Sequence, residues 1–489
     1  MGASLAFATP GEGAEAAAEA GMRLGVSLDQ CPGPRTASAD PSGITAVRGT
    51  VFFDANDSAH GGELWKTDGT RAGTVLVKDI NPGAGTSNPS YETAVNGTLF
   101  FTAEDGTHGG ELWKSDGTRA GTVLVRDIRT DSSPYGPRNL TAAAGQLFFT
   151  VDDGTHGLEL WKSDGTRAGT VLVKDINPGN APPYYHYNPS PFSLTAVGGT
   201  LFFTADDTVH GRELWKSDGT RAGTVLVRDI YPGSNYYGPT ALVSVGRTLF
   251  FSADDGVHDR ELWKTDGTRA GTVQVKDINT QGYPGSSPDP GIGWGRTWFA
   301  GADDGLHGRE LWKSDGTAAG TVLVKDIDPL IDHGYPRSGL PSEMTVAGGR
   351  LFFTADDGTH GRELWKSDGT RAGTALVRDT APGADRYAGP EYLAGAGERL
   401  FFTADDGIHG RELWKSDGSR AGTVMLKDIR SCVTGGYAHD PESLTGVGSR
   451  LFFTADDGTH GGELWKSDGT RAGTVMVKDI NTDMAGATP

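Results

Sequence analysis

The chain has 489 residues, and its 44 Lys and Arg residues against 63 Asp and Glu residues give a net charge of −19. This charge would repel nucleic-acid phosphates and anionic lipid surfaces, and no apolar run approaches the ~20 residues that a membrane-spanning helix needs. We therefore expect neither nucleic acid as a partner nor membrane insertion. Residues 1–19 are rich in Ala, Glu and Gly, which predicts a disordered tail or the remnant of a signal peptide.

Residues 20–40 are interpreted as an extra N-terminal strand followed by a connector. The run from Ala20 to Gly33 loosely matches the run from Ala222 to Gly233, which ends one of the repeat units described below. The last unit already contains its own copy of this run. We expect the extra strand to pair beside that unit and to help fasten the two ends of the chain.

Residues 41–489 are predicted to form one domain, because they contain nine copies of a single motif. Each copy has one tryptophan in the same place, and these are Trp65, Trp113, Trp161, Trp215, Trp263, Trp312, Trp365, Trp414 and Trp465. Eight intervals span the 400 residues between the first and the last, so the mean period is 50. A repeat of this length is typical of a propeller, a solenoid or an array.

The unit at 194–230 contains four short runs, which begin at Leu194, Thr200, Arg212 and Gly223. They are rich in β-branched and aromatic residues and are separated by Gly/Asp turns, so each unit is predicted to be a four-stranded antiparallel meander. The second run has consecutive apolar residues at 201–203, which requires cover on both faces of the strand.

Stacked blades provide that cover, so the predicted fold is all-β, a single nine-bladed β-propeller. Nine blades exceed the ~4–8 that are usual. A β-solenoid is the alternative, although it would need shorter and more uniform units, and two smaller rings would need a dividing linker. Unit six has Trp294 in its first run and Trp298-Phe299-Ala300 in its second. We interpret these changes as volume compensation in the core rather than as a ligand-stacking site.

The octad Glu213-Leu-Trp-Lys-Ser-Asp-Gly-Thr220 resembles the signature of the bacterial ELWxxDGT repeat family. The resemblance covers residues from about 41 to 480, and Ser419 is the only departure inside the octad. Members of that family are similar to other propeller-forming repeats and occur in secreted or surface proteins. The resemblance therefore implies a propeller and an extracellular or cell-surface location. It implies little about activity.

The turn from Asp356 to Glu363 recurs with small changes in every unit and places carboxylates and one imidazole within eight residues. Asp and Gly are the residues that a tight turn requires, so we expect the turn to be structural, with the histidine donating a hydrogen bond that fixes it, and we predict no cofactor. The alternative is a Ca²⁺ site, for which Asp356, Asp357, Glu363 and their repeat equivalents are the candidate ligands. Because His and Asp recur in every unit, and Ser in all units except those with Thr67 and Thr265, the repeat supplies no single asymmetric catalytic constellation.

Nearly all variation in unit length falls in the connectors after the fourth strands, which in a propeller emerge on one rim. All 13 tyrosines lie in or beside these connectors, among Gly, Ser and Asn, a composition typical of binding loops. The alternative is that tyrosine merely pins the loops to the rim. The predicted ligand-binding residues are Tyr135, Tyr184, Tyr185, Tyr187, Tyr236, Tyr237, Tyr283, Tyr335, Tyr387 and Tyr437.

We therefore predict a secreted or cell-surface scaffold, monomeric and not an enzyme, that binds or adheres to glycan or protein at the connector rim. The alternative function is a polysaccharide-acting hydrolase or lyase with its site at the channel mouth. Unique carboxylates available to such an enzyme are Asp332, Asp385 and Glu391.

Cys31 and Cys432 are the only two cysteines, and each follows a predicted fourth strand at nearly the same offset. A disulfide between them would fasten the ring where the two ends of the chain meet. Two unpaired thiols are the alternative. Bridged Cα atoms must lie ~5.5 Å apart, whereas neighbouring loops on the rim can be separated by more than this distance.

Overall fold

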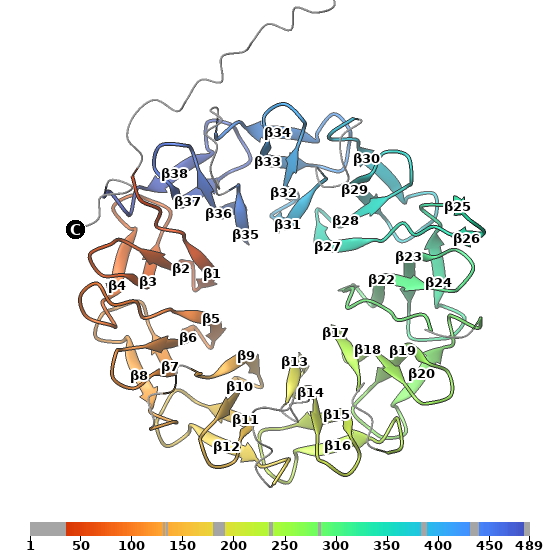
Figure 1. The fold of residues 1–489 in the computed structure, drawn as a ribbon, viewed down its shortest axis with the longest axis horizontal. Helices are drawn as coiled ribbons and strands as arrows, with labels where there is room; N and C mark the ends of the chain where they lie inside the picture. The colour runs from red at the N-terminus through yellow and green to blue at the C-terminus, as the bar shows by residue number, and fades with distance from the viewer. Residues whose placement is uncertain are drawn as a thin grey trace, which may run out of the picture.

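The computed structural model describes residues 36–130, 133, 135–178, 191–233, 238–281, 285–382, 389–430 and 440–483. Within them, nine four-stranded antiparallel sheets are arranged radially as blades, so the predicted nine-bladed β-propeller is confirmed (Figure 1). The four strands of each blade are consecutive in sequence, with the first nearest the axis and the fourth at the periphery. The described segments contain no helix, and hence none long and apolar enough to cross a membrane.

The blades are numbered in chain order. Blades 1 to 3 contain β1 (Ser42–Val47), β2 (Thr50–Asn56), β3 (Gly62–Thr67), β4 (Val75–Lys78); β5 (Ser90–Val95), β6 (Thr98–Glu104), β7 (Gly110–Ser115), β8 (Val123–Arg126); β9 (Arg138–Ala143), β10 (Gln146–Asp152), β11 (Leu158–Ser163) and β12 (Val171–Lys174). Blades 4 to 6 contain β13 (Phe192–Val197), β14 (Thr200–Asp206), β15 (Arg212–Ser217), β16 (Val225–Arg228); β17 (Thr240–Val245), β18 (Thr248–Asp254), β19 (Arg260–Thr265), β20 (Val273–Lys276); β21 (Ile292–Trp294), β22 (Thr297–Asp303), β23 (Arg309–Ser314) and β24 (Val322–Lys325). Blades 7 to 9 contain β27 (Ser342–Ala347), β28 (Arg350–Asp356), β29 (Arg362–Ser367), β30 (Ala375–Arg378); β31 (Glu391–Ala396), β32 (Arg399–Asp405), β33 (Arg411–Ser416), β34 (Val424–Lys427); β35 (Glu442–Val447), β36 (Arg450–Asp456), β37 (Gly462–Ser467) and β38 (Val475–Lys478). A small hairpin, β25 (Ile331–Asp332) and β26 (Tyr335–Pro336), lies in the connector between blades 6 and 7.

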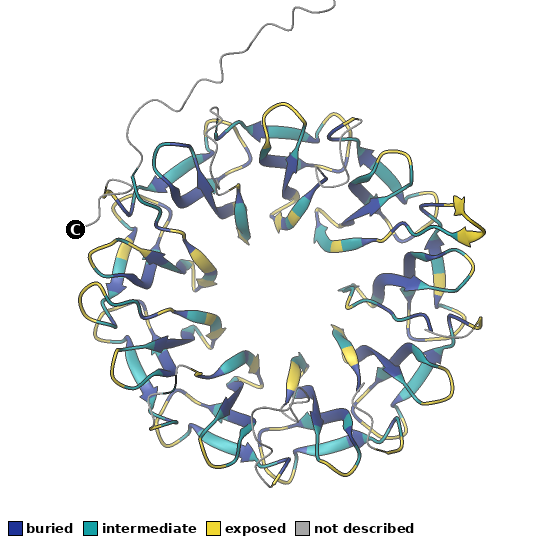
Figure 2. Ribbon diagram, viewed as in Figure 1, coloured by how far each residue is buried: buried dark blue, intermediate teal, exposed yellow. Residues whose placement is uncertain are grey.

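The second strand of each blade is covered on both faces, as its consecutive apolar residues predict. In β14, Leu201, Phe202 and Phe203 are at most 3% exposed. Successive side chains of a strand point to opposite faces, so Phe202 packs toward blade 5 and Phe203 toward blade 3. Apolar layers of this kind separate all neighbouring blades, and buried residues accordingly dominate the middle strands (Figure 2).

Blade 6 fills its layer with different residues. Trp298 and Ala300 stand where β14 has Leu201 and Phe203, and both belong to one buried cluster with Phe250. The ring of Trp298 stacks on that of Phe250 with centroids 6.3 Å apart. The larger Trp298 and the smaller Ala300 are thus both buried in the core, as volume compensation requires, while Trp294 is partly buried and packs on Phe299 with ring centroids 5.8 Å apart.

A cation from the fourth strand of each blade reaches the next blade. Lys325 Nζ lies 5.3 Å from the ring centroid of Trp365 and donates to Thr374 O at 2.9 Å. Lys478, in the last blade, makes the same two contacts with the first blade, over Trp65 at 5.2 Å and to Thr74 O at 2.9 Å. Blade 9 therefore meets blade 1 with the chemistry of the interior interfaces, and the ring is closed.

Residues 36–41 take the place of a connector between blades 9 and 1. Ala39 N donates to Gly462 O at 3.0 Å, and Ala39 O accepts from Asn56 N at 2.9 Å. Ser87, in the connector between blades 1 and 2, makes the equivalent hydrogen bonds, to Gly62 O at 2.9 Å and from Glu104 N at 2.8 Å. Ala39 thus bridges blades 9 and 1 as Ser87 bridges blades 1 and 2. The extra strand predicted at 20–33 lies outside the described residues.

Candidate functional site

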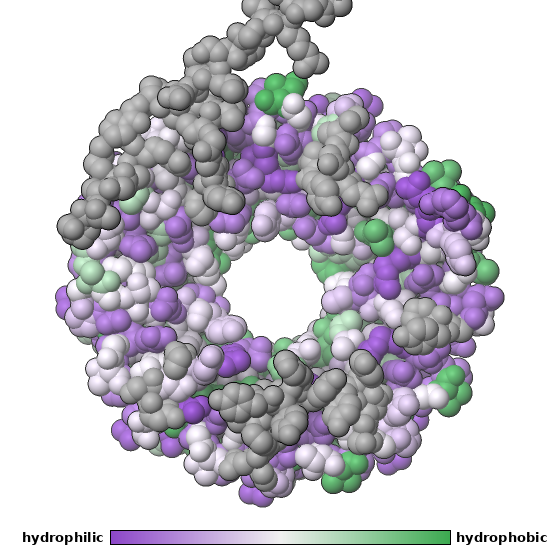
Figure 3. All heavy atoms as spheres, viewed as in Figure 1, coloured by the Kyte–Doolittle hydropathy of each residue, from purple (hydrophilic) through white to green (hydrophobic). Residues whose placement is uncertain are grey.

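The ring has an open central channel (Figure 3) and two different faces. We call one of them the connector face, because it carries both the connectors that follow the fourth strands and the turns between the second and third strands. These two sets of loops touch: Ser58 Oγ, in the turn after β2, donates to Asn481 Oδ1, which follows β38, at 2.8 Å. Variable loops and repeated turns therefore lie side by side on this face.

A buried glutamate begins each Glu-Leu-Trp run and holds the connector. Glu63 accepts hydrogen bonds from Ile80 N at 2.9 Å, Asn81 N at 3.1 Å and Ser87 Oγ at 2.7 Å. Burial raises the pKa of Glu63 to about 7, although these hydrogen bonds act in the opposite direction. Backbone amides that follow the fourth strand bind the equivalent glutamate in every blade, so we assign this residue a structural role.

The acidic turn that was a candidate calcium site uses its oxygens to hold its own backbone. Asp356 Oδ1 accepts from Gly358 N at 2.8 Å, and Asp357 Oδ1 accepts from His360 N at 2.9 Å. Asp357 Oδ2 lies 2.8 Å from His360 Nδ1, and this hydrogen bond raises the pKa of the histidine. Glu363 Oε2 accepts from the backbone and the hydroxyl of Thr380. Across the described segments, no group of three or more His, Cys, Asp and Glu side chains is placed to hold a metal ion.

The nine copies form an internal alignment that shows where the repeat is broken. The residue before each Glu-Leu-Trp run is arginine in blades 4 to 8, but leucine in blade 3 and glycine in blades 9, 1 and 2. The five arginines are Arg212, Arg260, Arg309, Arg362 and Arg411. The neighbouring turn carries an exposed aliphatic side chain in four of these five blades, at Val209, Val257, Leu306 and Ile408. Blades 4 to 8 therefore present a connector face of distinct chemistry.

A cavity of about 510 Å³ opens on this half of the ring, between blades 6 and 7. It borders the start of β21, which has only three residues, whereas the first strands of the other blades have six. Pro290 and Gly291 occupy the missing part of that strand and line the cavity, together with Leu340 and Met344. A proline has no amide hydrogen for the sheet, so the strand begins late.

Two pairs of opposite charge also line the cavity. Arg309 Nη1 lies 3.1 Å from Asp289 Oδ1. Arg362 Nη2 donates to Ser342 Oγ at 2.8 Å and lies 3.9 Å from Glu343 Oε1. Burial raises the pKa of Asp289, and the charge of Arg309 opposes that shift. The cavity therefore combines apolar walls with guanidinium and carboxylate groups.

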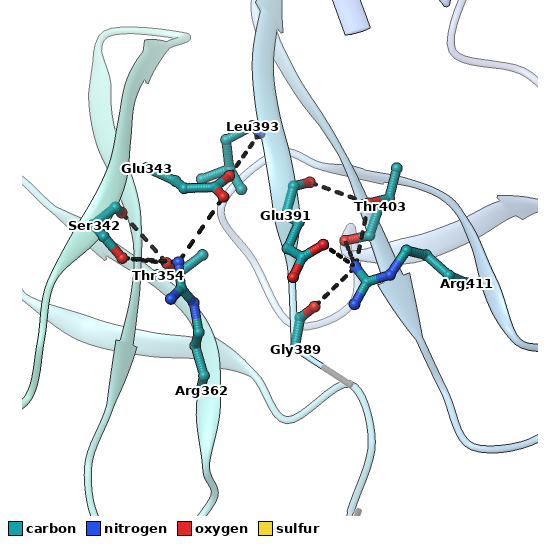
Figure 4. Close-up of polar contacts among 9 residues, drawn as sticks. All are labelled: Ser342, Glu343, Thr354, Arg362, Gly389, Glu391, Leu393, Thr403 and Arg411. Carbon is teal, nitrogen blue, oxygen red and sulfur yellow. Dashed lines mark hydrogen bonds and ion pairs between the residues drawn. The ribbon is translucent and has the colours of Figure 1, made fainter. Parts of the chain in front are cut away.

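The same arrangement continues onto blade 8 (Figure 4). Arg411 Nη1 donates to Gly389 O at 3.1 Å and lies 3.4 Å from Glu391 Oε2. Glu343 of blade 7 links the two blades, because its Oε2 accepts from Leu393 N at 3.4 Å. Glu391, one of the unique carboxylates noted in the sequence, therefore belongs to a row of charged pairs that begins at the cavity.

Tyr392 lies beside this row and is 47% exposed. Its pKa is raised by burial of the hydroxyl and then by the charges of Glu442 and Glu391. The backbone of Tyr392 is left-handed, with φ of 55°, at a bulge where β31 pairs with β32. An L-residue adopts this conformation at some cost, and bulges of this kind redirect a side chain.

The bulge recurs in the first strand of eight blades, and two of them have a tyrosine at the left-handed position. Neither tyrosine is among the predicted ligand-binding residues. The left-handed residues are Gly43, Tyr91, Asn139, Ser193, Ala241, Glu343, Tyr392 and Ser443. Tyr91 and Tyr392 belong to the first strands that border the channel rather than to the connectors. Their place two residues after a proline, Pro89 or Pro390, is the only signal that the sequence offers.

Of the ten predicted ligand-binding tyrosines, Tyr135 and Tyr335 are within the described residues. Tyr335 is 76% exposed, in the hairpin between blades 6 and 7. Tyr135 is 66% exposed, but the guanidinium of Arg138 lies over its ring at 5.5 Å and occupies one face. The other eight, Tyr184, Tyr185, Tyr187, Tyr236, Tyr237, Tyr283, Tyr387 and Tyr437, lie outside the described residues, as do Asp385, Cys31 and Cys432. Asp332 is exposed beside His333, with 2.6 Å between Oδ1 and Nδ1.

No family model and no curated protein matches the chain, so the ELWxxDGT resemblance rests on the motif alone. Among solved structures, the chain is similar to the computationally designed protein Ika8, with 14% identity, a TM-score of 0.40, and coverage of 78% of this chain and 99% of that one. It is also similar to a puromycin hydrolase, with 13% identity, a TM-score of 0.41, and coverage of 93% of this chain and 55% of the hydrolase.

A structure of prolyl endopeptidases matches with 14% identity and a TM-score of 0.38, over 78% of this chain and 54% of that chain. The chain thus spans about half the length of these two enzymes. Likenesses this distant carry no argument about what the chain binds or whether it catalyses a reaction.

Proposed function

We propose that the protein is a carbohydrate-binding scaffold, and that its primary site is the cavity between blades 6 and 7 with the adjoining charged row of blades 7 and 8. The observation that carries the proposal is the cavity itself. Its volume of about 510 Å³ lies within the ~300–1,000 Å³ usual for ligand sites. It stands where the internal alignment departs from the repeat.

The chemistry of the lining favours a glycan. Guanidinium forks and carboxylates at Arg309, Asp289, Arg362 and Glu343 match the alternating donors and acceptors of sugar hydroxyls. Met344 and its apolar neighbours suit the C–H faces of a pyranose ring. Tyr392, on the next blade, offers an exposed aromatic ring of the kind on which a further sugar unit packs.

The proposal keeps the sequence-based expectation of adhesion and an extracellular or cell-surface location, and it treats the protein as a binder rather than an enzyme. A rigid ring that presents variable loops on one face suits this role. The tyrosine-rich connectors are expected to contribute further contacts around the primary site, since they emerge on the same face.

A glycan array with two matched variants tests this function. Arg362→Gly introduces the residue that blades 9, 1 and 2 have at this position, so its backbone is compatible with the fold. We expect at least tenfold weaker binding for this variant and unchanged binding for Arg212→Gly in blade 4, which does not line the cavity. A silent array together with turnover of a polysaccharide by the wild type would refute the proposal and favour the hydrolase or lyase alternative.

A further inference from the structure

Two carboxylates break the repeat on the opposite side of the ring, between blades 1 and 2. Asp54 in β2 takes a position that is threonine in six blades, serine in blade 5 and glycine in blade 6. Glu92 in β5 takes a position that is otherwise aliphatic, except for Gly291 in blade 6. The aliphatic equivalents are Ile44, Leu140, Leu194, Leu242, Met344, Leu393 and Leu444, and all of them pack in or against a hydrophobic cluster between blades.

The two side chains face the same interface. Phe52, two residues before Asp54 in β2, packs into the cluster between blades 1 and 2, and side chains two residues apart share a face. Ile44, the equivalent of Glu92 in blade 1, packs toward the preceding blade, so Glu92 is directed toward blade 1. The negative charge of Glu92 accordingly helps to raise the pKa of Asp54 to about 7, after burial.

The surrounding backbone is adapted to this pair. Gly43 is the only glycine among the eight left-handed bulge residues, and a Cβ atom there would lie 2.5 Å from the carboxylate oxygens of Glu92. The carboxylate of Glu92 thus coincides with a glycine that makes room for it.

No ion pair with a cationic side chain is found for either carboxylate in the part of the chain that the structure describes. Asp54 Oδ1 and Glu92 Oε1 are buried atoms without a hydrogen-bond partner. The threonine at the position of Asp54 uses its hydroxyl as a donor in the other blades: Thr102 Oγ1 donates to Pro137 O before the next blade at 2.6 Å, and Thr150 Oγ1 donates to Arg138 O within its own blade at 3.3 Å. An ionised aspartate has no proton to donate, whereas a protonated one has. The buried oxygens therefore favour the protonated acid.

We propose that Asp54 and Glu92 form a proton-operated latch between blades 1 and 2, which holds the interface closed when the pair is protonated and loosens it when both carboxyl groups ionise. Like charges in a partly buried interface repel, and each ionised group also loses its hydration there. The latch lies one blade from the junction of blades 9 and 1, so its opening loosens the part of the ring where the two ends of the described chain lie.

The charged groups that act on the pair do not cancel this effect. Glu92 and Glu63 both raise the pKa of Asp54, and burial raises the pKa of Glu92 to about 7. Only backbone amides, of Ala55 and of Glu92 itself, act in the opposite direction. On the elements described around the pair, no Lys, Arg or His side chain lowers the pKa of either group.

Hydrogen exchange of the whole chain at pH 5.5 and pH 8, corrected for intrinsic exchange rates, tests the latch. We expect peptides of β1 and β5 to lose at least tenfold of their protection at pH 8, while β13 and β17 in the interface between blades 4 and 5 change much less. In the double variant Asp54→Thr/Glu92→Leu, which carries the residues of the other blades, this local loss should disappear. An unchanged loss in the variant, or an equal loss in all blades, would overturn the proposal.

Two further measurements keep the test decisive. Gly43→Ser restores the type of residue found in other blades, so it should lower the melting temperature of the wild type but not that of the Glu92→Leu background. The exchange pattern should also be the same in EDTA and in 1 mM Ca²⁺. If Ca²⁺ restored protection at pH 8, a cation rather than a proton would satisfy the carboxylates, and the latch as proposed would be wrong.

Discussion

Because Lys478 joins blade 9 to blade 1, its replacement should lower the free energy of unfolding by a predictable amount. Replacing this residue by methionine keeps the apolar stem but removes the ammonium group, which lies 5.2 Å from the centroid of Trp65 and 2.9 Å from Thr74 O. A partly desolvated cation–π contact contributes about 0.5–2 kcal/mol and a charged hydrogen bond about 1.5–3 kcal/mol. Since the methionine stem retains some contact, we expect the free energy of unfolding to fall by about 2 kcal/mol.

Lys325→Met is the matched control, because Lys325 makes the same two contacts, at 5.3 Å and 2.9 Å, inside the ring. In a closed ring the two variants lose equal stability in chemical denaturation followed by tryptophan fluorescence. For a cooperative unit of roughly 440 residues, about 2 kcal/mol corresponds to a melting temperature lower by only about 2 °C, so denaturant is the better probe. If Lys478→Met cost nothing while Lys325→Met cost about 2 kcal/mol, the contact between blades 9 and 1 would not form and the reasoning would fail.

Three further predictions concern pH, metal and the cysteines. Burial raises the pKa of the repeated glutamates, to about 7 at Glu63 and to about 8 at Glu463, so the folded chain keeps protons that the unfolded chain loses above about pH 4.5. Stability should therefore fall as pH rises through 7, and the melting temperature at pH 8.5 should be about 5 °C or more below that at pH 5.5. A higher melting temperature at pH 8.5 would contradict this sign. Because the oxygens of Asp357 already accept hydrogen bonds from their own turn, EDTA should leave the melting temperature unchanged, whereas a drop that Ca²⁺ reverses would place an ion in these turns. The predicted Cys31–Cys432 disulfide should yield one cross-linked peptide in non-reducing mapping, and two alkylatable thiols in protein purified without reductant would exclude it.

Much of the fold follows from the repeated motif, because each strand is specified by local residues and each interface repeats. The consecutive apolar side chains at 201–203 predict a strand covered on both faces, and the Asp-Gly turns predict where each hairpin reverses. The histidine of each turn was expected to fix it by a hydrogen bond. The contact of His360 with Asp357 confirms this in one blade and recurs in the others.

Other features depend on contacts between distant residues and could not be predicted. The sequence predicts a connector within 20–40, but not that Ala39 donates to blade 9 and accepts from blade 1, as Ser87 does between blades 1 and 2. The cavity is lined by Pro290 and Gly291, which precede the short β21, and the apolar pattern does not encode the shortening of that strand. The change from arginine in blades 4 to 8 to glycine in blades 9, 1 and 2 before Glu-Leu-Trp is visible in the sequence. Its meaning required the positions of Asp289, Glu343 and Glu391 opposite the arginines.

The most direct test of the proposed function is to locate a bound glycan on the ring. Hydrogen exchange of the wild type should be measured with and without the strongest glycan from the array, at a saturating concentration. We predict protection in peptides covering 338–347 and 389–396, which border the cavity and Tyr392, and no change in the equivalent peptides of blades 1 and 2. Protection confined to blades 9, 1 and 2, or to the face opposite the connectors, would contradict the assignment of the site.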